Sequence, residues 1–351
     1  QYARRFWDDT VSSDHPVVQS LFSGLVRGER SALAKSITIV ESTSPFRKAV
    51  GEQLLRLMLQ RLKDLYAKDG YKSFIFRIGI SGAPGSGKSS FIETFGEFLI
   101  RHCGKKVAVL TIDPSSQTSG GSLLGDVTRM TELSRNPRAY VRSSPTRGQL
   151  GGVTHGTREA ILLCEGAGYD VVFVETVGVG QSEVAIADIT DMLVLLWAPG
   201  QGDELQGLKR GIMEMSDLVL VTKSDGDLVP QAQLAQTEIL SALKFMRPRT
   251  NLWRPKVQRV SAFTGEGVEK VWNTMSDYWD KIGTSGWLAE QRRRQLERWT
   301  WQQLEHDLLM VFRDHPQIAE HAQLLMRQIQ SGQMTPALAS ETLIKRFCNL
   351  E

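Results

Sequence analysis

The segment GISGAPGSGKSSFI, residues 79–92, limits the possible folds of this chain more than any other feature. It follows the apolar run FIFRI and matches the pattern GxxxxGK(S/T), placed between an expected strand and an expected helix. Its small residues allow successive backbone N–H groups to point at one anion, and the helix that begins here adds the positive end of its dipole. We therefore expect a nucleotide-phosphate site, in which Lys88 bridges the β- and γ-phosphates and the Ser89 hydroxyl binds Mg²⁺. The residues expected around the phosphates are Gly82, Ala83, Pro84, Gly85, Ser86, Gly87, Lys88, Ser89 and Ser90.

Short apolar segments alternate with helical patterns through the middle of the chain. Most of these segments are continuous runs of Val, Ile and Leu, which is typical of parallel strands covered on both faces. Helices between them return the chain in the same direction, so that ligands bind at the carboxyl ends of the strands. The pattern predicts an α/β fold of the P-loop NTPase type, with a doubly wound, mostly parallel sheet. The expected strands are FIFRIGI, VAVLTI, DVVFVE, DMLVLLWA, DLVLVTK and KVQRVSA.

Helical patterns lie on both sides of this central region. Apolar residues recur three and four positions apart in VVQSLFSGLVRG and in the segment FRKAVGEQLLRLMLQRLKDLYAKDG, and Ser44-Pro45 predicts the start of the longer helix. We expect an N-terminal helical region over residues 1–72, a nucleotide-binding domain over 73–282 and a C-terminal helical arm over 283–351. In this arm, the run of arginines at 292–294 is interpreted as a solvated face, and Trp299 and Trp301 as a surface for a dimer partner.

Charge and cysteine content exclude several classes of function. The net charge of +3 over 351 residues gives no support to a nucleic-acid or membrane-surface partner. Cys103, Cys164 and Cys348 are far apart, which favours reduced thiols in the cytoplasm over a disulfide framework or a zinc or nickel site. No apolar run is long enough to span a bilayer.

Three acidic residues are candidates for the surroundings of the metal ion. Glu175, in FVETVGVGQ, ends a strand and can face the phosphates, in the position where ordinary P-loop GTPases carry the Asp of DxxG. Asp113 ends the strand VAVLTID at the same edge of the sheet. Asp126 lies in the glycine-containing segment GGSLLGDVTRM, and the residues alone leave it open between a surface charge and a switch residue.

The segment VLVTKSD is the candidate for recognition of the base. The Asp225 carboxylate can accept hydrogen bonds from guanine N1–H and its exocyclic amine, whereas adenine would leave the charge unpaired. The Lys223 stem can pack along the base. Thr222 departs from the usual NKxD pattern and removes one side-chain amide, which bears on the affinity for the base more than on its identity. The pair Ser261 and Ala262, after the next strand, strengthens the prediction of GTP over ATP.

At this level of detail the chain resembles the MeaB-type GTPases, also labelled ArgK or MMAA, of the SIMIBI class. The resemblance rests on GAPGSGKS, DPSSQTSGGSLLGDVTRM, VETVGVGQSE, APGQGDELQGLKRGIMEMSD and TKSD, and it covers essentially the whole chain. These proteins are G-protein chaperones of adenosylcobalamin-dependent methylmalonyl-CoA mutase. The resemblance implies a homodimer held partly by the C-terminal arm, and slow GTP hydrolysis that the mutase accelerates. It also implies a role in loading intact cofactor and removing damaged cofactor.

The resemblance also implies roles for individual residues. Lys88 and Ser89 would bind phosphate and Mg²⁺, and Asp225 would recognise guanine. Asp113, Asp126 and Glu175 would surround Mg²⁺ and the hydrolytic water. The segment 200–211 would be an additional switch, in which Asp203, Glu204 and Lys209 couple the nucleotide state to the partner. Its four glycines around several charges are compatible with a loop that orders in one nucleotide state.

Other functions compete with this hypothesis. A kinase that phosphorylates an amino-acid (arginine or ornithine) transport protein needs an acceptor pocket and a catalytic base, and neither is evident in the sequence. Nickel insertion needs Cys and His ligands that this chain lacks. A nucleotide-gated scaffold with incidental hydrolysis is the remaining alternative. His155 is interpreted as structural, since P-loop GTPases generally position water without a histidine.

Overall fold

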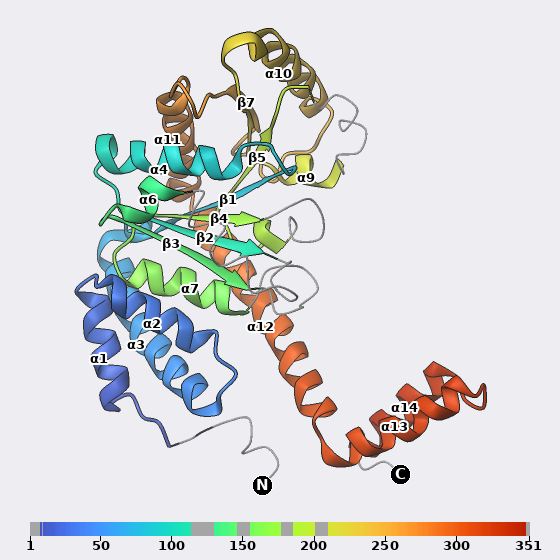
Figure 1. Ribbon diagram of the computed structural model, residues 1–351. Coiled ribbons are helices and arrows are strands. Elements are labelled where there is room, and N and C mark those ends of the chain that lie inside the picture. The colour runs from blue at the N-terminus through green and yellow to red at the C-terminus, as the bar shows by residue number, and fades with distance from the viewer. Residues whose placement is uncertain are drawn as a thin grey trace.

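The computed structural model describes residues 8, 10–113, 130–145, 155–176, 185–200 and 210–348 of the chain. The described residues form a seven-stranded sheet in which every neighbouring pair is parallel, in the order β3-β2-β4-β1-β5-β6-β7 (Figure 1). The doubly wound α/β fold expected from the sequence is therefore confirmed. The strands are β1 (Phe76–Gly82), β2 (Val107–Asp113), β3 (Ala139–Pro145), β4 (Val171–Thr176), β5 (Met192–Trp197), β6 (Leu218–Val221) and β7 (Lys256–Arg259).

Strand β3 is the one strand of the described sheet that sequence patterns do not predict. Its segment AYVRSSP carries Arg142 and two serines, so it lacks the continuous apolar character of the other strands. β3 lies at the edge of the sheet and pairs only with β2 among the described strands. Arg142 is accommodated there because its guanidinium donates to the Glu41 carboxylate, 2.5 Å away, at the end of an N-terminal helix.

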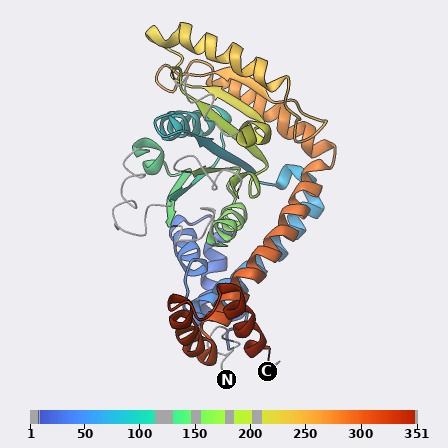
Figure 2. The same cartoon turned by 90° about the vertical axis from the view of Figure 1, so that its right-hand side faces the viewer.

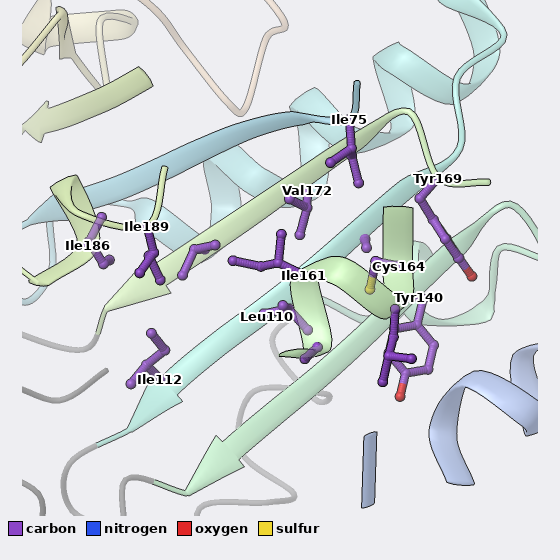
Figure 3. Packing of buried hydrophobic residues seen from close by; sticks show 14 of the residues in the cluster. Ile75, Leu110, Ile112, Tyr140, Ile161, Cys164, Tyr169, Val172, Ile186 and Ile189 are labelled. Carbon is purple, nitrogen blue, oxygen red and sulfur yellow. The ribbon is translucent and has the colours of Figure 1, made fainter. Parts of the chain in front are cut away.

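Side chains from alternate positions of the sheet enter two separate cores. Val171 and Phe173 face a core covered by α4 (Lys88–Cys103), α6 (Thr131–Arg135) and α11 (Val268–Thr284). Val172 and Val174 face the opposite core, in which Figure 3 labels Val172. That second core is covered by α7 (His155–Gly166), α9 (Arg210–Met215) and α10 (Val229–Leu243). Burial of the strands on both faces explains their unbroken apolar sequences.

The N-terminal helices pack beside α7 on the second core. They are α1 (Pro16–Val26), α2 (Arg30–Val40) and α3 (Pro45–Asp69), and α3 begins at the Pro45 that the sequence predicted. The short helix η2 (Gly70–Ser73) then leads into β1. The division of the chain at residues 72/73 and 282/283 stays a prediction, and α11 continues across the second of these positions.

The C-terminal helices extend away from the sheet. Figures 1 and 2 show α12 (Trp287–Arg313) leaving the body and ending near α13 (Pro316–Gln330) and α14 (Pro336–Phe347), which pack against each other. The first turns of α12 are buried, whereas its second half exposes Trp301, Leu304 and Leu308. Trp299 is half-buried against its own chain, where its Nε1 donates to the Asp188 carbonyl oxygen, 3.1 Å away, and its assignment to a dimer surface stays a prediction.

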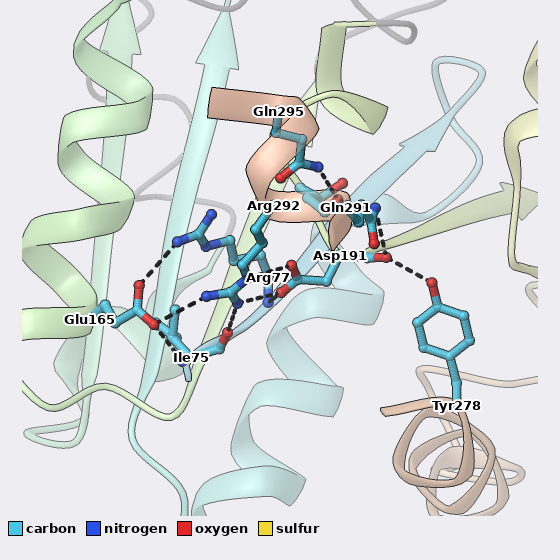
Figure 4. Close-up of polar contacts among 9 residues, drawn as sticks. Ile75, Arg77, Glu165, Asp191, Tyr278, Gln291, Arg292 and Gln295 are labelled. Carbon is cyan, nitrogen blue, oxygen red and sulfur yellow. Dashed lines mark hydrogen bonds and ion pairs between the residues drawn. The ribbon is translucent and has the colours of Figure 1, made fainter. Parts of the chain in front are cut away.

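The expectation of a solvated arginine run at 292–294 is wrong for Arg292. Its guanidinium is buried and donates to both Asp191 carboxylate oxygens, at 2.9 and 2.8 Å, and to the Ile75 carbonyl oxygen, at 2.6 Å (Figure 4). Glu165 lies 3.3 Å from the same guanidinium. Arg293 and Arg294 are exposed and pair with acidic residues of their own helix. Helical spacing alone does not show which of three successive arginines faces the body.

Candidate nucleotide-binding site

The loop between β1 and α4 has the geometry of a phosphate site. Gly87 precedes the first helical residue with a positive φ of 86°, and Gly82 ends β1 with a φ of 152°. A Cβ atom at Gly82 would lie 2.5 Å from the Leu196 carbonyl oxygen of neighbouring β5, so this position requires glycine. The chain thus turns sharply at the carboxyl end of a central strand and enters a helix whose N-terminal N–H groups face the loop.

Lys88 is held within this loop. Its side chain is 8% exposed, and its ammonium donates to the carbonyl oxygens of Gly82 and Ala83, at 2.8 and 3.1 Å. The loop backbone therefore fixes the position of a positive charge among N–H groups that can receive an anion. A bound phosphate would add an anionic partner to an ammonium that is already in place.

Ser89 and Glu175 meet beside the loop. The Ser89 hydroxyl donates to the Glu175 carboxylate, 3.1 Å away. Glu175 is 3% exposed and pairs with Ile80 in the register of β4 and β1, which brings the carboxyl ends of the two strands together. A hydroxyl and a carboxylate are oxygen ligands of the kind that Mg²⁺ prefers, so these two residues fit a magnesium ion next to a nucleotide.

The other acidic candidates lie partly or wholly outside the described residues. The backbone of Asp113 ends β2, at the same edge of the sheet as Glu175, as the sequence predicted. Nothing of its side chain is described, and Asp126 lies outside the described residues altogether. Asp203, Glu204 and Lys209 of the additional switch lie outside them as well. Among the residues that are described, no group of three or more His, Cys, Asp or Glu side chains could hold a metal ion.

A cavity of about 380 Å³ lies beside the phosphate loop at the carboxyl ends of β6 and β7. The Asp225 carboxylate at this cavity accepts a hydrogen bond from the Ser261 hydroxyl. Lys223 has a φ of 52°, unusual for a residue other than glycine. The cavity is lined by Gly87, Ser90, Phe91, Thr222, Lys223, Asp225, Leu228, Val260, Ala262 and Phe263.

Thr222 links the two halves of the site. Its hydroxyl oxygen lies 2.7 Å from the carbonyl oxygen of Ser86, in the phosphate loop, and 3.1 Å from that of Trp197. In the sequence, Thr222 occupies the position of the Asn in NKxD, and from the sequence alone only the loss of the side-chain amide was evident. The buried hydroxyl instead connects the base cavity to the phosphate loop. This contact crosses 136 positions of the chain, so no local pattern could have indicated it.

The sequence analysis missed four residues of the cavity lining. Phe91, Leu228 and Val260 supply apolar wall, and Phe263 stands at the opening with 93% of its surface exposed. The one available signal was the position of Phe263 directly after Ala262, in the segment already expected to approach the base. The other residues come from a helix, a turn and a strand end that only the fold brings together.

A phosphate loop after β1, a strand-end carboxylate beside it and a cavity next to TKSD are together typical of the P-loop GTPases. Comparison with known proteins agrees with this class. The chain belongs to the family described as "Methylmalonyl Co-A mutase-associated GTPase MeaB", whose model matches residues 33–317. One curated relative and one solved structure extend the match to nearly the full length of the chain, and a second relative matches over four fifths of it.

The first relative is "Methylmalonic aciduria type A homolog, mitochondrial" of Caenorhabditis elegans, with 56% identity over 347 residues, 99% of this chain and 87% of that protein. The second is "GTPase ArgK" of Escherichia coli, with 42% identity over 285 residues, 81% of this chain and 83% of that protein. A crystal structure of an LAO/AO transport system kinase superimposes with a TM-score of 0.71 at 32% identity, covering 95% of this chain and 98% of that one. The chain is thus a GTPase, which converts GTP and water to GDP and phosphate.

Proposed function

We propose that this GTPase assists and protects an adenosylcobalamin-dependent methylmalonyl-CoA mutase, by controlling the loading and exchange of its cofactor. The family description and its match to residues 33–317 carry the proposal, because the family is defined by association with that mutase. The name of the worm relative points to the same metabolic step. The described part of the chain contains no helix long and apolar enough to cross a membrane.

Hydrolysis in this proposal depends on charge held near the γ-phosphate. Lys88 supplies a fixed positive charge where negative charge develops in the transition state. Ser89 and Glu175, with Asp113 and Asp126, would hold Mg²⁺ and orient the attacking water. When bound, the metal ion neutralises the β- and γ-phosphate oxygens. The contact between Ser89 and Glu175 supports this assignment for two of the four ligands.

Recognition of the base is assigned to Asp225. Its carboxylate lines the cavity beside the phosphate loop, and the Ser261 hydroxyl donates to one of its oxygens. This hydrogen bond fixes the carboxylate in one orientation while leaving acceptor positions for guanine N1–H and the exocyclic amine. The additional switch at 200–211 would transmit the nucleotide state to the mutase, as the family resemblance implies.

The test of this function compares GTP and ATP turnover of the purified chain, with and without a cobalamin-dependent mutase. We expect slow hydrolysis of GTP, little of ATP, and a faster GTP rate when the mutase is present. The solved neighbour described as a transport system kinase favours one alternative, in which the chain phosphorylates a transport protein. Preference for ATP, with radiolabel transferred from its γ-phosphate to a second protein, would replace our proposal with that alternative.

The C-terminal arm is proposed to form a homodimer. The second half of α12 exposes a row of apolar side chains, and apolar patches on a protein surface often mark an interaction site. Trp301, Leu304 and Leu308 are spaced at i, i+3 and i+7 and therefore lie on one face of α12. The exposed fractions of these and the neighbouring apolar residues exceed one half: Trp301, Leu304, Leu308, Leu309, Met326, Leu338 and Ile344.

We expect light scattering to give the mass of two copies for the wild-type chain and of one copy for the variant Leu304→Asp/Leu308→Asp, because the new charges would have to be buried at the interface. The matched control is Leu234→Asp/Leu240→Asp on α10, which changes exposed leucines of the body and should leave the dimer intact. A dimer that survives the arm substitutions would place the interface elsewhere.

The cellular compartment of the protein is proposed from the state of its cysteines. Cys103, Cys164 and Cys348 are free thiols in the described part of the chain, which suits a reducing environment. Burial raises the pKa of the Cys164 thiol and keeps it protonated and unreactive. The cytoplasmic location expected from the sequence stays a prediction, and the worm relative is named as mitochondrial. Fractionation of the native source followed by immunoblotting decides between the two.

A further inference from the structure

Phe263 has the largest exposed fraction, 93%, among the large apolar side chains of the described residues. Exposed apolar residues are common on protein surfaces and need no special explanation when they stand alone. Phe263 differs because it lines the 380 Å³ cavity together with Asp225 and Lys223. Its ring therefore stands at the opening of the site where the base is proposed to bind.

The backbone around Phe263 is held on both sides. The Thr94 hydroxyl of α4 donates to the Ala262 carbonyl oxygen, at 2.8 Å. On the other side, the Thr264 N–H donates to the Ser261 hydroxyl oxygen, at 3.0 Å. That same hydroxyl donates to Asp225, so the loop that carries the ring and the carboxylate of the cavity are joined through one side chain. The loop that exposes Phe263 is therefore hydrogen-bonded on both sides of the ring.

The rest of the cavity suits a planar aromatic ligand. Leu228, Val260 and Phe91 supply apolar wall, and Asp225 is the one carboxylate among the lining residues. A purine needs hydrogen bonds at its edge and apolar or aromatic contact on its faces. The lining supplies the edge contact through Asp225, and the exposed ring of Phe263 is an available face contact.

We propose that Phe263 is the stacking residue of the guanine pocket: its ring packs on a face of the base whose edge Asp225 recognises, and shields that face from water. This inference rests on the proposed binding of guanine nucleotides at this cavity. Stacking does not depend on the edge of the base, because every purine has a similar π face. Phe263 therefore determines affinity and residence time, whereas Asp225 determines the choice of base.

Inosine diphosphate separates the two roles, because its base lacks the exocyclic amine of guanine but keeps the same ring face. By calorimetry, we expect Phe263→Ala to weaken binding of GDP and of inosine diphosphate by the same factor, about tenfold. The loss should appear as a faster dissociation rate. Phe263→Tyr should bind like the wild type, and Phe263→Leu should lie between, since it keeps apolar area without a π face. Asp225→Asn should instead change the ratio of the two affinities.

The matched control is Phe245→Ala. Phe245 is 84% exposed, two residues after the end of α10, and does not line the cavity, so its removal should leave both affinities unchanged. If the wild-type chain binds GDP tightly and the affinity of Phe263→Ala for GDP lies within twofold of that value, the stacking role is wrong and the proposed function stands. If the wild-type chain binds no guanine nucleotide, the proposed function itself fails, and the role of Phe263 fails with it.

Discussion

Replacing Lys88 with alanine is expected to weaken GDP and GTP binding by on the order of a hundredfold or more. The buried ammonium is fixed by two carbonyl oxygens of the loop, and truncation of one partner of a buried charge pair typically costs 2–5 kcal/mol, with each 1.4 kcal/mol a factor of ten. Calorimetric titration of the variant with GDP in the presence of magnesium measures the loss directly. GTP hydrolysis should fall with binding.

The control for this prediction is Lys105→Ala, just beyond the other end of α4. Lys105 is partly exposed and lies 3.7 Å from Asp170, a surface pair whose removal has little effect. Lys88→Met removes the charge but keeps most of the stem, so it separates loss of charge from loss of packing. If Lys88→Met retains wild-type affinity, the charge is not needed for nucleotide binding and the assignment of the phosphate loop is wrong.

Replacing Arg292 with alanine is expected to lower stability by about 3–5 kcal/mol, because it leaves the buried Asp191 and Glu165 carboxylates without their shared partner. Arg77 remains 3.0 Å from Glu165 and compensates only part of the loss. In a chain of this size the unfolding temperature should fall by roughly 5–15 °C, as followed by circular dichroism. The first turns of α12 should detach from the body together with this loss.

The pH dependence of the Arg292→Ala effect follows from Glu165. Burial raises the pKa of this carboxyl, but Arg77 and Arg292 outweigh burial and hold it below its ordinary value. The contribution of ionised Glu165 to stability is therefore complete above the pKa that this carboxyl has in the unfolded chain. It is lost as the pH falls through the lower pKa of the folded chain. Without Arg292 the buried Glu165 carboxylate can take up a proton, so the difference in unfolding free energy between variant and wild type should shrink from neutral pH toward about pH 5.

Arg293→Ala is the matched control, one residue further along the same helix. Arg293 is exposed and pairs with Glu290 and Glu297 of its own helix, so its removal should leave the unfolding temperature essentially unchanged. Equal unfolding temperatures for Arg292→Ala and the wild type would mean that the buried network does not hold α12 on the body. If the difference in unfolding free energy between Arg292→Ala and the wild type grows as the pH falls, the role assigned to Glu165 is wrong.

The buried network also connects the arm to residues 185–191, the segment that leads into β5. The Gln291 and Gln295 amides donate to the Thr190 carbonyl oxygen, at 3.2 and 2.9 Å. Thr190 in turn packs on β1, where a Cβ atom at Gly79 would lie 2.9 Å from its hydroxyl oxygen. The helix that carries the proposed dimer surface is therefore anchored next to the strand that ends in the phosphate loop.

Much of the site could be predicted from local sequence because its chemistry is local. The glycines, Lys88 and Ser89 lie within one turn between a strand and a helix, and a loop of this kind folds in the same way wherever it occurs. Asp225 and Ser261 each follow a strand closely, and parallel strands bring their carboxyl ends to one edge of the sheet. Edge strand β3 could not be predicted in the same way, because Arg142 is stabilised by Glu41, about a hundred positions away in the chain.

The sequence by itself determined the parallel sheet, the phosphate loop and the order of the nucleotide motifs, since each depends on neighbouring residues and on strand periodicity. Only the tertiary structure decided which arginine of 292–294 is buried, that the Thr222 hydroxyl meets Ser86, and that Phe263 stands over the base cavity. These three depend on contacts between segments far apart in the chain. The energy of such contacts comes from desolvation and hydrogen-bond geometry, which exist only once the elements have packed together.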